Sequence, residues 1–461
     1  MLDKGDFLSK FRSFLFSAQI LDTSYPVEDT YVMFPFGHTL KESLFDFFRT
    51  KFEQHFQAQM VEIPQRIPID FLKIHSSTTN LLDNPDYQDQ VPITTIGNQK
   101  ESINTLFRGA MDFGQYFLLK KLINSYKDLP ASLITRGYTF RRDNGIPLAR
   151  DPEIEFLEGI IAFEPDEDKL KDRFISMVQI LQDCFTQLGI PTFATWKPAF
   201  SERSSLNRSV KLFTSIPGTT GIISVAIIHF FHSKPMDFFD IKTQSKDQQT
   251  IVPWVINYAI TQRVLFAYLV HHFDVNGFSF PPTTFKNNIV AIPRAKPKEL
   301  AEFLPIMEQT IHSHLNAVPW ESFPLKGSMK SSLALAEQQG FPIRLELGPR
   351  DINNNIITIA IRKTVEKISI PLVNLESYIL ELISDLQQQF AKEVELKQFN
   401  LNSFKDLTIR QKNLCTSCQE EYNVKHHIIG RSFDHFKVQG SQICEICHNA
   451  EAVPVLIGRI W

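Results

Sequence analysis

One stretch of the chain, residues 139–158, predicts two strands joined by a short turn that contains a glycine and a proline. Arg141 precedes this turn and Arg150 follows it, while Ile154 and Glu158 come next at even spacings of four residues. Two strands joined in this way would aim both arginines at one polyphosphate, because a guanidinium group matches the geometry of phosphate oxygens. The stretch therefore predicts a phosphate-binding hairpin.

The composition predicts an ordinary globular protein with several domains. The 461 residues are enough for about three domains of roughly 150 residues each. The hydrophobic fraction of 43% and the charged fraction of 21% are typical of such proteins, and 40 phenylalanines indicate aromatic-rich cores. The net charge of −3 argues against a general coat for nucleic acid, but it leaves room for a local basic site on one domain.

The N-terminus and the apolar segments predict a cytoplasmic protein without a membrane anchor. Residues 1–6 lack the basic start and the apolar run of a signal peptide. The longest apolar stretch, residues 221–231, is far shorter than the roughly 20 residues that a membrane helix needs.

The spacing of apolar residues predicts a mixture of helices and strands in the first 280 residues. Helices are expected at residues 41–56, 111–126, 169–188 and 255–272. Strands are expected at residues 135–142, 153–163 and 221–231. The last strand is a continuous run rich in isoleucine and valine, which is typical of a buried central strand.

A pair of prolines at residues 281–282 interrupts the chain, and a compact α/β unit of about 100 residues is expected after it. Its expected strands are residues 288–292, 342–347 and 356–361. Its expected helices are residues 298–315 and a long amphipathic helix that begins at Leu375.

Four of the five cysteines form two CxxC pairs near the C-terminus: Cys415, Cys418, Cys444 and Cys447. Two such pairs can close a tetrahedral thiolate site for zinc. This zinc would be structural, because four protein ligands leave no open position for a substrate. The CxxCH sequence ending at His448 is also the haem-attachment pattern, but haem would leave the first pair unexplained and the chain shows no export signal. The histidines between the pairs can be ordinary surface or core residues.

Several segments, taken in order along nearly the whole chain, add up to a family pattern. Residues 25–37, the stretch 139–158 and residues 259–263 are similar to the three motifs of class II aminoacyl-tRNA synthetases. Residues 340–351, Gly-Phe-Pro-Ile-Arg-Leu-Glu-Leu-Gly-Pro-Arg-Asp, are close to an anticodon-binding signature that is rare elsewhere. The chain thus resembles the archaeal and eukaryotic-type prolyl-tRNA synthetases. The second and third motifs lie about 100 residues apart, which leaves no room for the editing insertion of bacterial relatives.

The resemblance implies an α+β protein with three domains. These would be a class II catalytic domain with an antiparallel sheet (1–283), an α/β anticodon-binding domain (284–395) and a small C-terminal zinc-binding domain (396–461). It also implies a ligase that activates an amino acid, proline in this family, with ATP and Mg²⁺ and passes it to tRNA, here tRNA-Pro. Such enzymes are usually homodimers that associate through the first motif.

The resemblance also assigns residues to ATP. Arg141 maps to the arginine that contacts the α-phosphate, and Asp143 maps to the acid that reads the adenine amino group. Arg150 would contact the γ-phosphate side, Glu158 would lie near the phosphates and Mg²⁺, and Arg263 would clamp the γ-phosphate. Arg141 and Arg263 are therefore the expected catalytic residues, which act by charge and position without a covalent intermediate.

The amino-acid pocket departs from the family pattern. Ile154 stands where the family stacks adenine on a phenylalanine. The expected amino-acid contacts are Arg108 and Asp112, from a loop written Arg-Pro-Thr-Ser-Glu in the family, and His229, whose neighbours have become isoleucines. The lost polar groups leave an alternative open, a paralogue that kept the scaffold. It would use another amino acid or a carrier, or bind tRNA without catalysis.

The same residues also have interpretations without a ligand. Arg141 and Arg150 can be surface arginines, His229 can be a satisfied core histidine, and Asp112 can be an acid at a helix start. Arg263 is expected inside an otherwise apolar helix, where an unpaired charge is costly, so a ligand-facing role is favoured. Four basic residues can face tRNA or pair within their own domain: Arg344, Arg350, Arg362 and Lys363.

Overall fold

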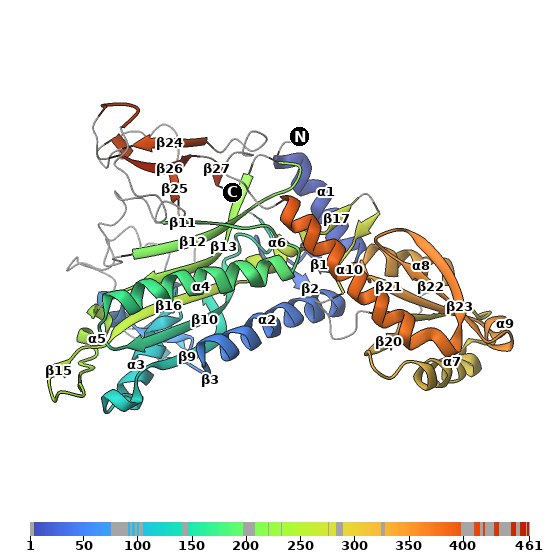
Figure 1. The fold of residues 1–461 in the computed structure, drawn as a ribbon, viewed down its shortest axis with the longest axis horizontal. Helices are drawn as coiled ribbons and strands as arrows, with labels where there is room; N and C mark the ends of the chain where they lie inside the picture. The colour runs from blue at the N-terminus through green and yellow to red at the C-terminus, as the bar shows by residue number, and fades with distance from the viewer. Residues whose placement is uncertain are drawn as a thin grey trace.

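The structure is a computed structural model, and it describes residues 4–74, 91–92, 95–96, 99–100, 105–140, 146–196, 208–219, 221–231, 233–274, 276–282, 289–323, 328–397, 410–414, 418–419, 428–432, 444–448, 452–457 and 459–460. Within these residues one large sheet carries most of the chain, and a smaller α/β unit lies at one end of the molecule, on the right in Figure 1.

The large sheet runs in the order β24-β26-β25-β11-β12-β13-β16-β10-β9-β3, with β27 paired to β13 beside this path. Its strands are β3 (Gln59–Val61), β9 (Ala131–Phe140), β10 (Glu153–Phe163), β11 (Phe193–Trp196), β12 (Arg208–Ser215), β13 (Gly221–Phe230) and β16 (Trp254–Thr261). The C-terminal strands are β24 (Arg410–Leu414), β25 (Ile428–Ser432), β26 (Val453–Ile457) and β27 (Arg459–Ile460). Neighbouring strands from β11 to β9 pair antiparallel.

Four helices contribute to the hydrophobic cluster on one face of this sheet: α1 (Lys4–Ser17), α2 (Pro35–Phe56), α4 (Glu167–Gln187) and α6 (Arg263–His271). Helix α4 begins after Asp166, whose side chain accepts a hydrogen bond from the main-chain N–H of Lys169 at 3.0 Å. Its apolar residues recur three and four positions apart and so face the sheet. Phe48 of α2 and Phe185 of α4 join the two helices, with ring centroids 5.2 Å apart.

The opposite face of the sheet is covered at one end by α3 (Asp112–Leu122), whose residues Phe113, Tyr116 and Leu119 pack against Ile160 of β10. The rest of this face carries the candidate site. The short elements nearby are β1 (Leu21–Asp22), β2 (Val32–Met33), β4 (Arg66–Pro68), β5 (Val91–Pro92), β6 (Thr95–Ile96), β7 (Gln99–Lys100), β8 (Thr105–Phe107), α5 (Lys234–Phe238), β14 (Thr243–Gln244), β15 (Thr250–Ile251), β17 (Phe273–Asp274), β18 (Gly277–Phe278) and the 3-10 helices η1 (Ile69–Ile74) and η4 (Tyr126–Asp128).

The α/β unit holds a sheet in the order β20-β19-β21-β22-β23. Its strands are β19 (Ile289–Pro293), β20 (Trp320–Ser322), β21 (Ile343–Leu347), β22 (Ile356–Ile361) and β23 (Glu366–Pro371). Its helices are α7 (Leu300–His314), α8 (Met329–Gln338), α9 (Pro349–Asn353) and α10 (Leu375–Lys397), with the 3-10 helix η6 (Leu372–Asn374). Helix α10 also contacts α4, so this unit packs against the helices of the large sheet.

Most expected elements are present with small shifts. The strand at residues 153–163 is confirmed as β10, and the central strand at 221–231 as β13, which ends at Phe230. The helix expected at 41–56 begins earlier, because Pro35 occupies its first turn, where a missing N–H costs nothing. In the α/β unit, the short helix α9 lies in the connection between the two strands expected at residues 342–347 and 356–361.

The helix expected at residues 255–272 is wrong. Residues Trp254–Thr261 form strand β16, and only Arg263–His271 are helical. Strand β16 is buried on both faces, so its sequence lacks the alternation that marks a half-exposed strand. Arg263 is therefore the first residue of a helix and does not lie in a helix interior.

None of the described helices combines the length and the apolar character that crossing a bilayer requires.

Candidate active site

The expected hairpin is formed by β9 and β10, which pair antiparallel from Phe140 opposite Glu153 to Ala131 opposite Ala162. Residues 141–145 lie outside the described residues, so Arg141 and Asp143 have no described position. The return of the hairpin is described. Ile146 and Arg150 form a bridge, and Leu148 between them is fully buried with a φ of 67°.

The return of the hairpin is hydrogen-bonded to the start of α6. The Nε of Arg263 donates to the main-chain carbonyl of Ala149 at 2.7 Å, and the main-chain N–H of Arg263 donates to Thr261 Oγ1 at 3.2 Å. Arg150, the next residue after Ala149, is exposed. Two arginines expected to contact phosphates thus come from segments that the structure holds together, although their contacts with ATP stay a prediction.

An apolar floor lies beside these arginines. Met111, Ile154, Phe156 and Ala259 form a small buried cluster, and the half-buried Ile227 packs against it. These residues come from three adjacent strands and from the residue before α3, and the expected adenine neighbour Ile154 is only 3% exposed. The floor can accept a flat or apolar group by contact, and it offers that group few hydrogen bonds.

Glu158 sits at the edge of this floor, opposite Ala259 in the sheet register. Its side chain is buried, and its Oε1 accepts a hydrogen bond from Asn257 Nδ2 at 2.5 Å. Asn257 was not identified from the sequence. An asparagine in an apolar strand was the available signal, because a buried amide needs a partner.

Arg108 has a structural role that the sequence did not predict. It is 2% exposed and donates to three main-chain carbonyls: Ile63 at 3.1 Å, Pro64 at 2.9 Å and Tyr138 at 3.0 Å. Burial lowers the pKa of Arg108 to about 10, against the opposing charge of Glu158. A Cβ at Gly137 would lie 2.3 Å from its Nη2, so this glycine makes room for the guanidinium group.

The other two expected amino-acid contacts have partners within the chain. Asp112 is the first residue of α3, where an acid is favoured, and it is buried beside Tyr116. Burial, with the charge of Asp112, raises the pKa of Tyr116. His229 Nδ1 lies 2.7 Å from Ser209 Oγ on the neighbouring strand. Contacts of Asp112 and His229 with an amino acid stay predictions.

The opposite face of the hairpin holds a network of ion pairs that the sequence did not reveal. Glu155 of β10 pairs with Lys41 of α2 at 2.6 Å and with Arg136 of β9 at 2.8 Å. Arg136 also donates to Glu42 of α2 at 2.6 Å. Although burial alone would lower the pKa of Lys41, its hydrogen bond to Glu155 raises it. The network fixes α2 to the hairpin.

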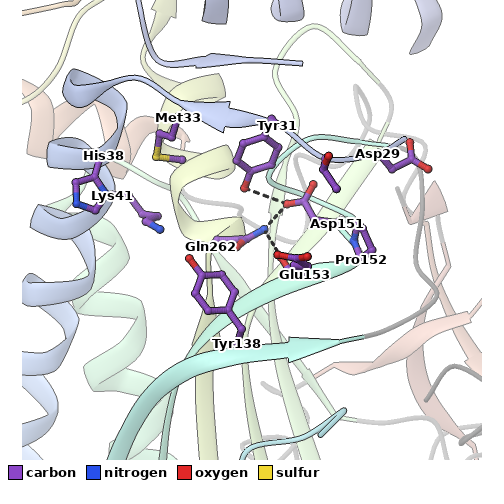
Figure 2. A pocket seen from close by; sticks show the side chains of 11 residues that line it. Asp29, Tyr31, Met33, His38, Lys41, Tyr138, Asp151, Pro152, Glu153 and Gln262 are labelled. Atoms are coloured by element: carbon purple, nitrogen blue, oxygen red, sulfur yellow. Dashed lines mark hydrogen bonds between the residues drawn. The ribbon is translucent and has the colours of Figure 1, made fainter. Parts of the chain in front are cut away.

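A cleft of about 290 Å³ opens next to this network, between the first turn of α2 and the hairpin (Figure 2). Asp151 lies in it, 3% exposed, with hydrogen bonds from Tyr31, Gln262 and the main-chain N–H of Leu148. Burial raises the pKa of Asp151 to about 7, although these hydrogen bonds and the charge of Arg263 favour the carboxylate. None of Asp151, Tyr31 and Gln262 was identified from the sequence.

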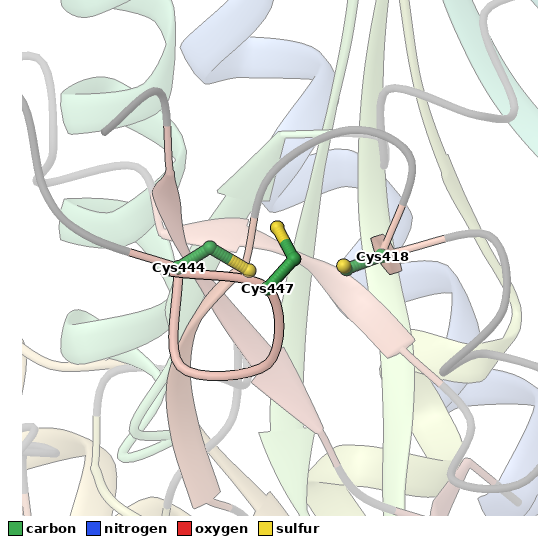
Figure 3. A group of neighbouring side chains, drawn as sticks. All are labelled: Cys418, Cys444 and Cys447. Carbon is green, nitrogen blue, oxygen red and sulfur yellow. The ribbon is translucent and has the colours of Figure 1, made fainter. Parts of the chain in front are cut away.

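Three of the four expected zinc ligands come together (Figure 3). The sulfur atoms of Cys418, Cys444 and Cys447 all lie within 4.8 Å of one another, and Cys415 lies outside the described residues. Three converging thiolates suit zinc, which prefers sulfur ligands in structural sites. Zinc binding itself stays a prediction.

In the α/β unit, three of the four basic residues pair within the chain. Arg362 donates to Asp274 Oδ1 at 2.8 Å and Lys363 pairs with Glu393 at 2.7 Å. Arg344 is buried with its Nη2 4.0 Å from Glu346 Oε1, and burial lowers its pKa, while Arg350 is exposed on α9. For Arg362 and Lys363 the interpretation as internal pairs therefore fits the structure.

Comparisons with known proteins agree with this arrangement. A family model described as "Anticodon binding domain" matches residues 323–382. The proline–tRNA ligase of Methanopyrus kandleri is 24% identical over 404 residues, which cover 86% of this chain and 81% of that protein. That of Methanococcoides burtonii is 21% identical over 477 residues, covering 99% and 98%. A solved structure titled "Giardia lamblia Prolyl-tRNA synthetase in complex with prolyl-adenylate" matches with a TM-score of 0.83 and 18% identity, covering 99% of this chain and 98% of that one, so the two share a fold.

Proposed function

We infer that the chain belongs to the prolyl-tRNA synthetase family of class II aminoacyl-tRNA synthetases, and that it activates proline with ATP and joins it to tRNA. The observation that carries this function is the nearly full-length match to archaeal proline–tRNA ligases, one of which spans 99% of the chain. Both of these relatives have the same activity in their names, so nothing favours the alternative of a paralogue with a changed substrate.

The reaction needs no covalent bond between enzyme and substrate, so the enzyme acts by charge stabilisation and positioning. The carboxylate of proline attacks the α-phosphorus of ATP, prolyl-adenylate forms, and pyrophosphate leaves. A tRNA hydroxyl then attacks the acyl carbon, and AMP leaves. Arg141 stabilises the charge that builds on the α-phosphate, while Arg150 and Arg263 hold the γ-phosphate side. The hydrogen bond from Arg263 to Ala149 supports this assignment, because it keeps the two segments together.

The nucleotide lies along the apolar floor. Asp143 reads the adenine amino group, and Ile154 with Phe156 provides an aliphatic and aromatic surface for the base. Glu158 lies near the phosphates, where its carboxylate offers the oxygen ligands that Mg²⁺ prefers. Bound Mg²⁺ neutralises charge on the phosphates, and the bond from Asn257 holds the Glu158 side chain in place for it.

Proline binds between Arg108, Asp112 and His229. Met111, the neighbour of Asp112, belongs to the apolar floor, and His229 lies two residues after Ile227 on the same strand. An apolar floor suits the pyrrolidine ring, which carries no polar side-chain group. The buried Arg108 then acts mainly by its positive charge and by holding the loop that carries Asp112.

We assign residues 1–283 to the catalytic domain, 284–395 to the anticodon-binding domain and 396–461 to a zinc-binding domain. The partner is tRNA, most specifically tRNA-Pro, and the protein is a homodimer associated through residues 25–37. Cys415, Cys418, Cys444 and Cys447 hold one structural Zn²⁺, which the convergence of the three described sulfur atoms supports. Metal analysis of the purified protein should find close to one zinc per chain, and less than half an equivalent would reject this site.

Proline-dependent exchange of pyrophosphate into ATP tests the proposed function. The protein should catalyse exchange with proline, and Arg141→Ala should lower the rate by about 100- to 1000-fold, as expected for loss of one charge-stabilising donor. Arg294→Ala is the matched control, because this exposed arginine lies outside the catalytic domain and should leave exchange unchanged.

The outcome separates the ligase from the alternative. Exchange with another amino acid would replace proline as the substrate. No exchange with any amino acid, together with retained tRNA binding, would reject the ligase in favour of a binding protein.

A further inference from the structure

Gln262 occupies the junction between β16 and α6 and bonds to three residues at the start of the second hairpin strand and just before it. Its main-chain N–H donates to Glu155 O at 3.0 Å, and its side-chain Oε1 accepts from Glu155 N at 3.0 Å. The side-chain amide therefore replaces the peptide group that would continue the sheet beyond the last register pair, Phe156 with Thr261. Its Nε2 donates to Glu153 O at 3.4 Å and to the carboxylate of Asp151.

Asp151 receives this bond in a buried position. Its carboxylate also accepts from Leu148 N at 3.1 Å and from Tyr31 Oη at 3.4 Å (Figure 2). Burying a carboxylate is costly unless hydrogen-bond donors compensate for the lost water. Here the donors come from three separate segments, namely the hairpin return, the residue before β2, and the β16–α6 junction.

The two linked residues are the chain neighbours of two expected phosphate ligands. Asp151 follows Arg150, and Gln262 precedes Arg263. We propose that Asp151 and Gln262 are positioning residues for ATP, whose side-chain hydrogen bond locks the hairpin return to the start of α6 and so fixes the relative placement of Arg150 and Arg263 on the phosphates. The proposal rests on the proposed ATP-dependent activation, and neither residue contacts the nucleotide itself.

The protonation state of Asp151 affects this link. A carboxylic acid accepts hydrogen bonds less well than a carboxylate does, so protonation weakens the bonds from Gln262, Tyr31 and Leu148. Burial raises the pKa of Asp151 to about 7, so the link loosens as the pH falls below that value. Among the described residues, the charged or titratable groups that act on Asp151 or line its cleft are Asp29, Tyr31, His38, Lys41, Tyr138, Glu153 and Arg263.

A swap of the two side chains tests the link. Asp151→Asn leaves one acceptor oxygen where the carboxylate used two, one for Leu148 and one for Gln262 and Tyr31, and Gln262→Glu places a second carboxylate against Asp151, so each single change weakens the link. The double variant restores one carboxylate and one amide with the bond reversed. Each single variant should raise the KM for ATP in the exchange reaction about 10-fold, with the KM for proline unchanged, and the double variant should return to within about threefold of the original value.

Glu153→Gln is the matched control. Glu153 lines the same cleft, and the variant also removes a carboxylate there. Gln262 bonds to the main-chain carbonyl of Glu153, which the substitution leaves in place, so the KM of this variant for ATP should not change. A His38→Asn variant controls for the histidine that lines the same cleft, because a free histidine also titrates between pH 6 and pH 8. It should retain the rise in KM for ATP that the unchanged protein shows between pH 8 and pH 6, whereas Asp151→Asn should lose that rise.

Calorimetric titration with ATP and Mg²⁺ in the absence of proline separates this proposal from the proposed function. If the protein binds ATP but shows no proline-dependent exchange, the assigned substrate fails and the link is still judged from ATP affinity. Single variants that bind ATP as the unchanged protein does would overturn the link, as would equal rises in the KM values for ATP and proline. If the single variants do not fold, the double variant and the pH dependence of the unchanged protein decide: no recovery, or no rise towards pH 6, rejects the proposal.

Discussion

The carboxylates on the two faces of strand β10 have different kinds of bonding partner. Glu155 faces α2 and pairs with two cations of the same chain, Lys41 and Arg136. Glu158, three residues later on the other face, accepts a hydrogen bond from the neutral amide of Asn257. The helix-covered face thus neutralises its charge internally. The site face retains carboxylate charge beside an apolar floor, as expected where a charged ligand and its metal ion complete the arrangement.

The largest expected effect is a loss of stability when the ion pairs of Glu155 on the helix-covered face are removed. Glu155→Gln leaves the buried Lys41 with a neutral partner, while Arg136 keeps its pair with Glu42, and removing one member of a buried pair costs about 3–5 kcal/mol. The free energy of unfolding, measured with denaturant, should fall by that amount. Exchange activity per folded molecule should change much less. Glu153→Gln, an exposed neighbour, should leave stability unchanged, and equal stability of the two variants would contradict the role of the network.

The next effect concerns Asp151, which lies on the same side of the sheet, where the hydrogen-bond donors found among the described residues are all neutral. Its pKa rises from 3.8 to about 7 on folding, so its contribution to stability is fully present below pH 4 and is lost as the pH rises through 7. The loss amounts to at most about 4 kcal/mol.

Unfolding curves at pH 5 and pH 8 measure this contribution. The unchanged protein should lose stability relative to Asp151→Asn as the pH rises between these values. A constant difference between the two proteins would contradict the raised pKa. Stability and ATP affinity therefore respond to pH in opposite directions at this residue.

The smallest effect concerns the site face. Glu158→Gln should lower the exchange rate roughly 10- to 100-fold, the range expected for a group that orients a metal ion or its ligands. Its free energy of unfolding should stay within about 1 kcal/mol of the original, because Asn257 can still bond to the amide oxygen. A loss of stability as large as that of Glu155→Gln would remove the contrast between the two faces.

The sequence predicts the parts of this fold that show local patterns. Strand β10 was predictable because a glycine and proline turn precedes it and its residues favour extended structure. Strand β16 was not, because burial on both faces erases the alternation that separates a strand from a helix. The motif order predicted the candidate arginines, since each motif is a short contiguous segment.

The contacts between distant segments escaped prediction. Glu155 meets Lys41 of a helix far earlier in the chain, and Asp151 meets Gln262 at the β16–α6 junction far later. Nothing in the local spacing of these residues indicates the pairing. Arg108 matched a ligand-binding loop in the sequence, yet its described bonds go to main-chain carbonyls, because only the folded chain brings those carbonyls to it.

The C-terminal strands have a consequence for synthesis of the protein. Strand β25 extends the catalytic sheet at β11, and Gly221 of β13, the strand that carries His229, pairs with Arg459 of β27. The sheet therefore acquires its last strands only after residues 459–460 have left the ribosome, and contacts this distant in sequence form slowly. A ribosome that stops early releases a chain with the hairpin arginines but an unfinished sheet. Truncated chains that lack these strands should consequently be degraded by proteases and should show no enzyme activity.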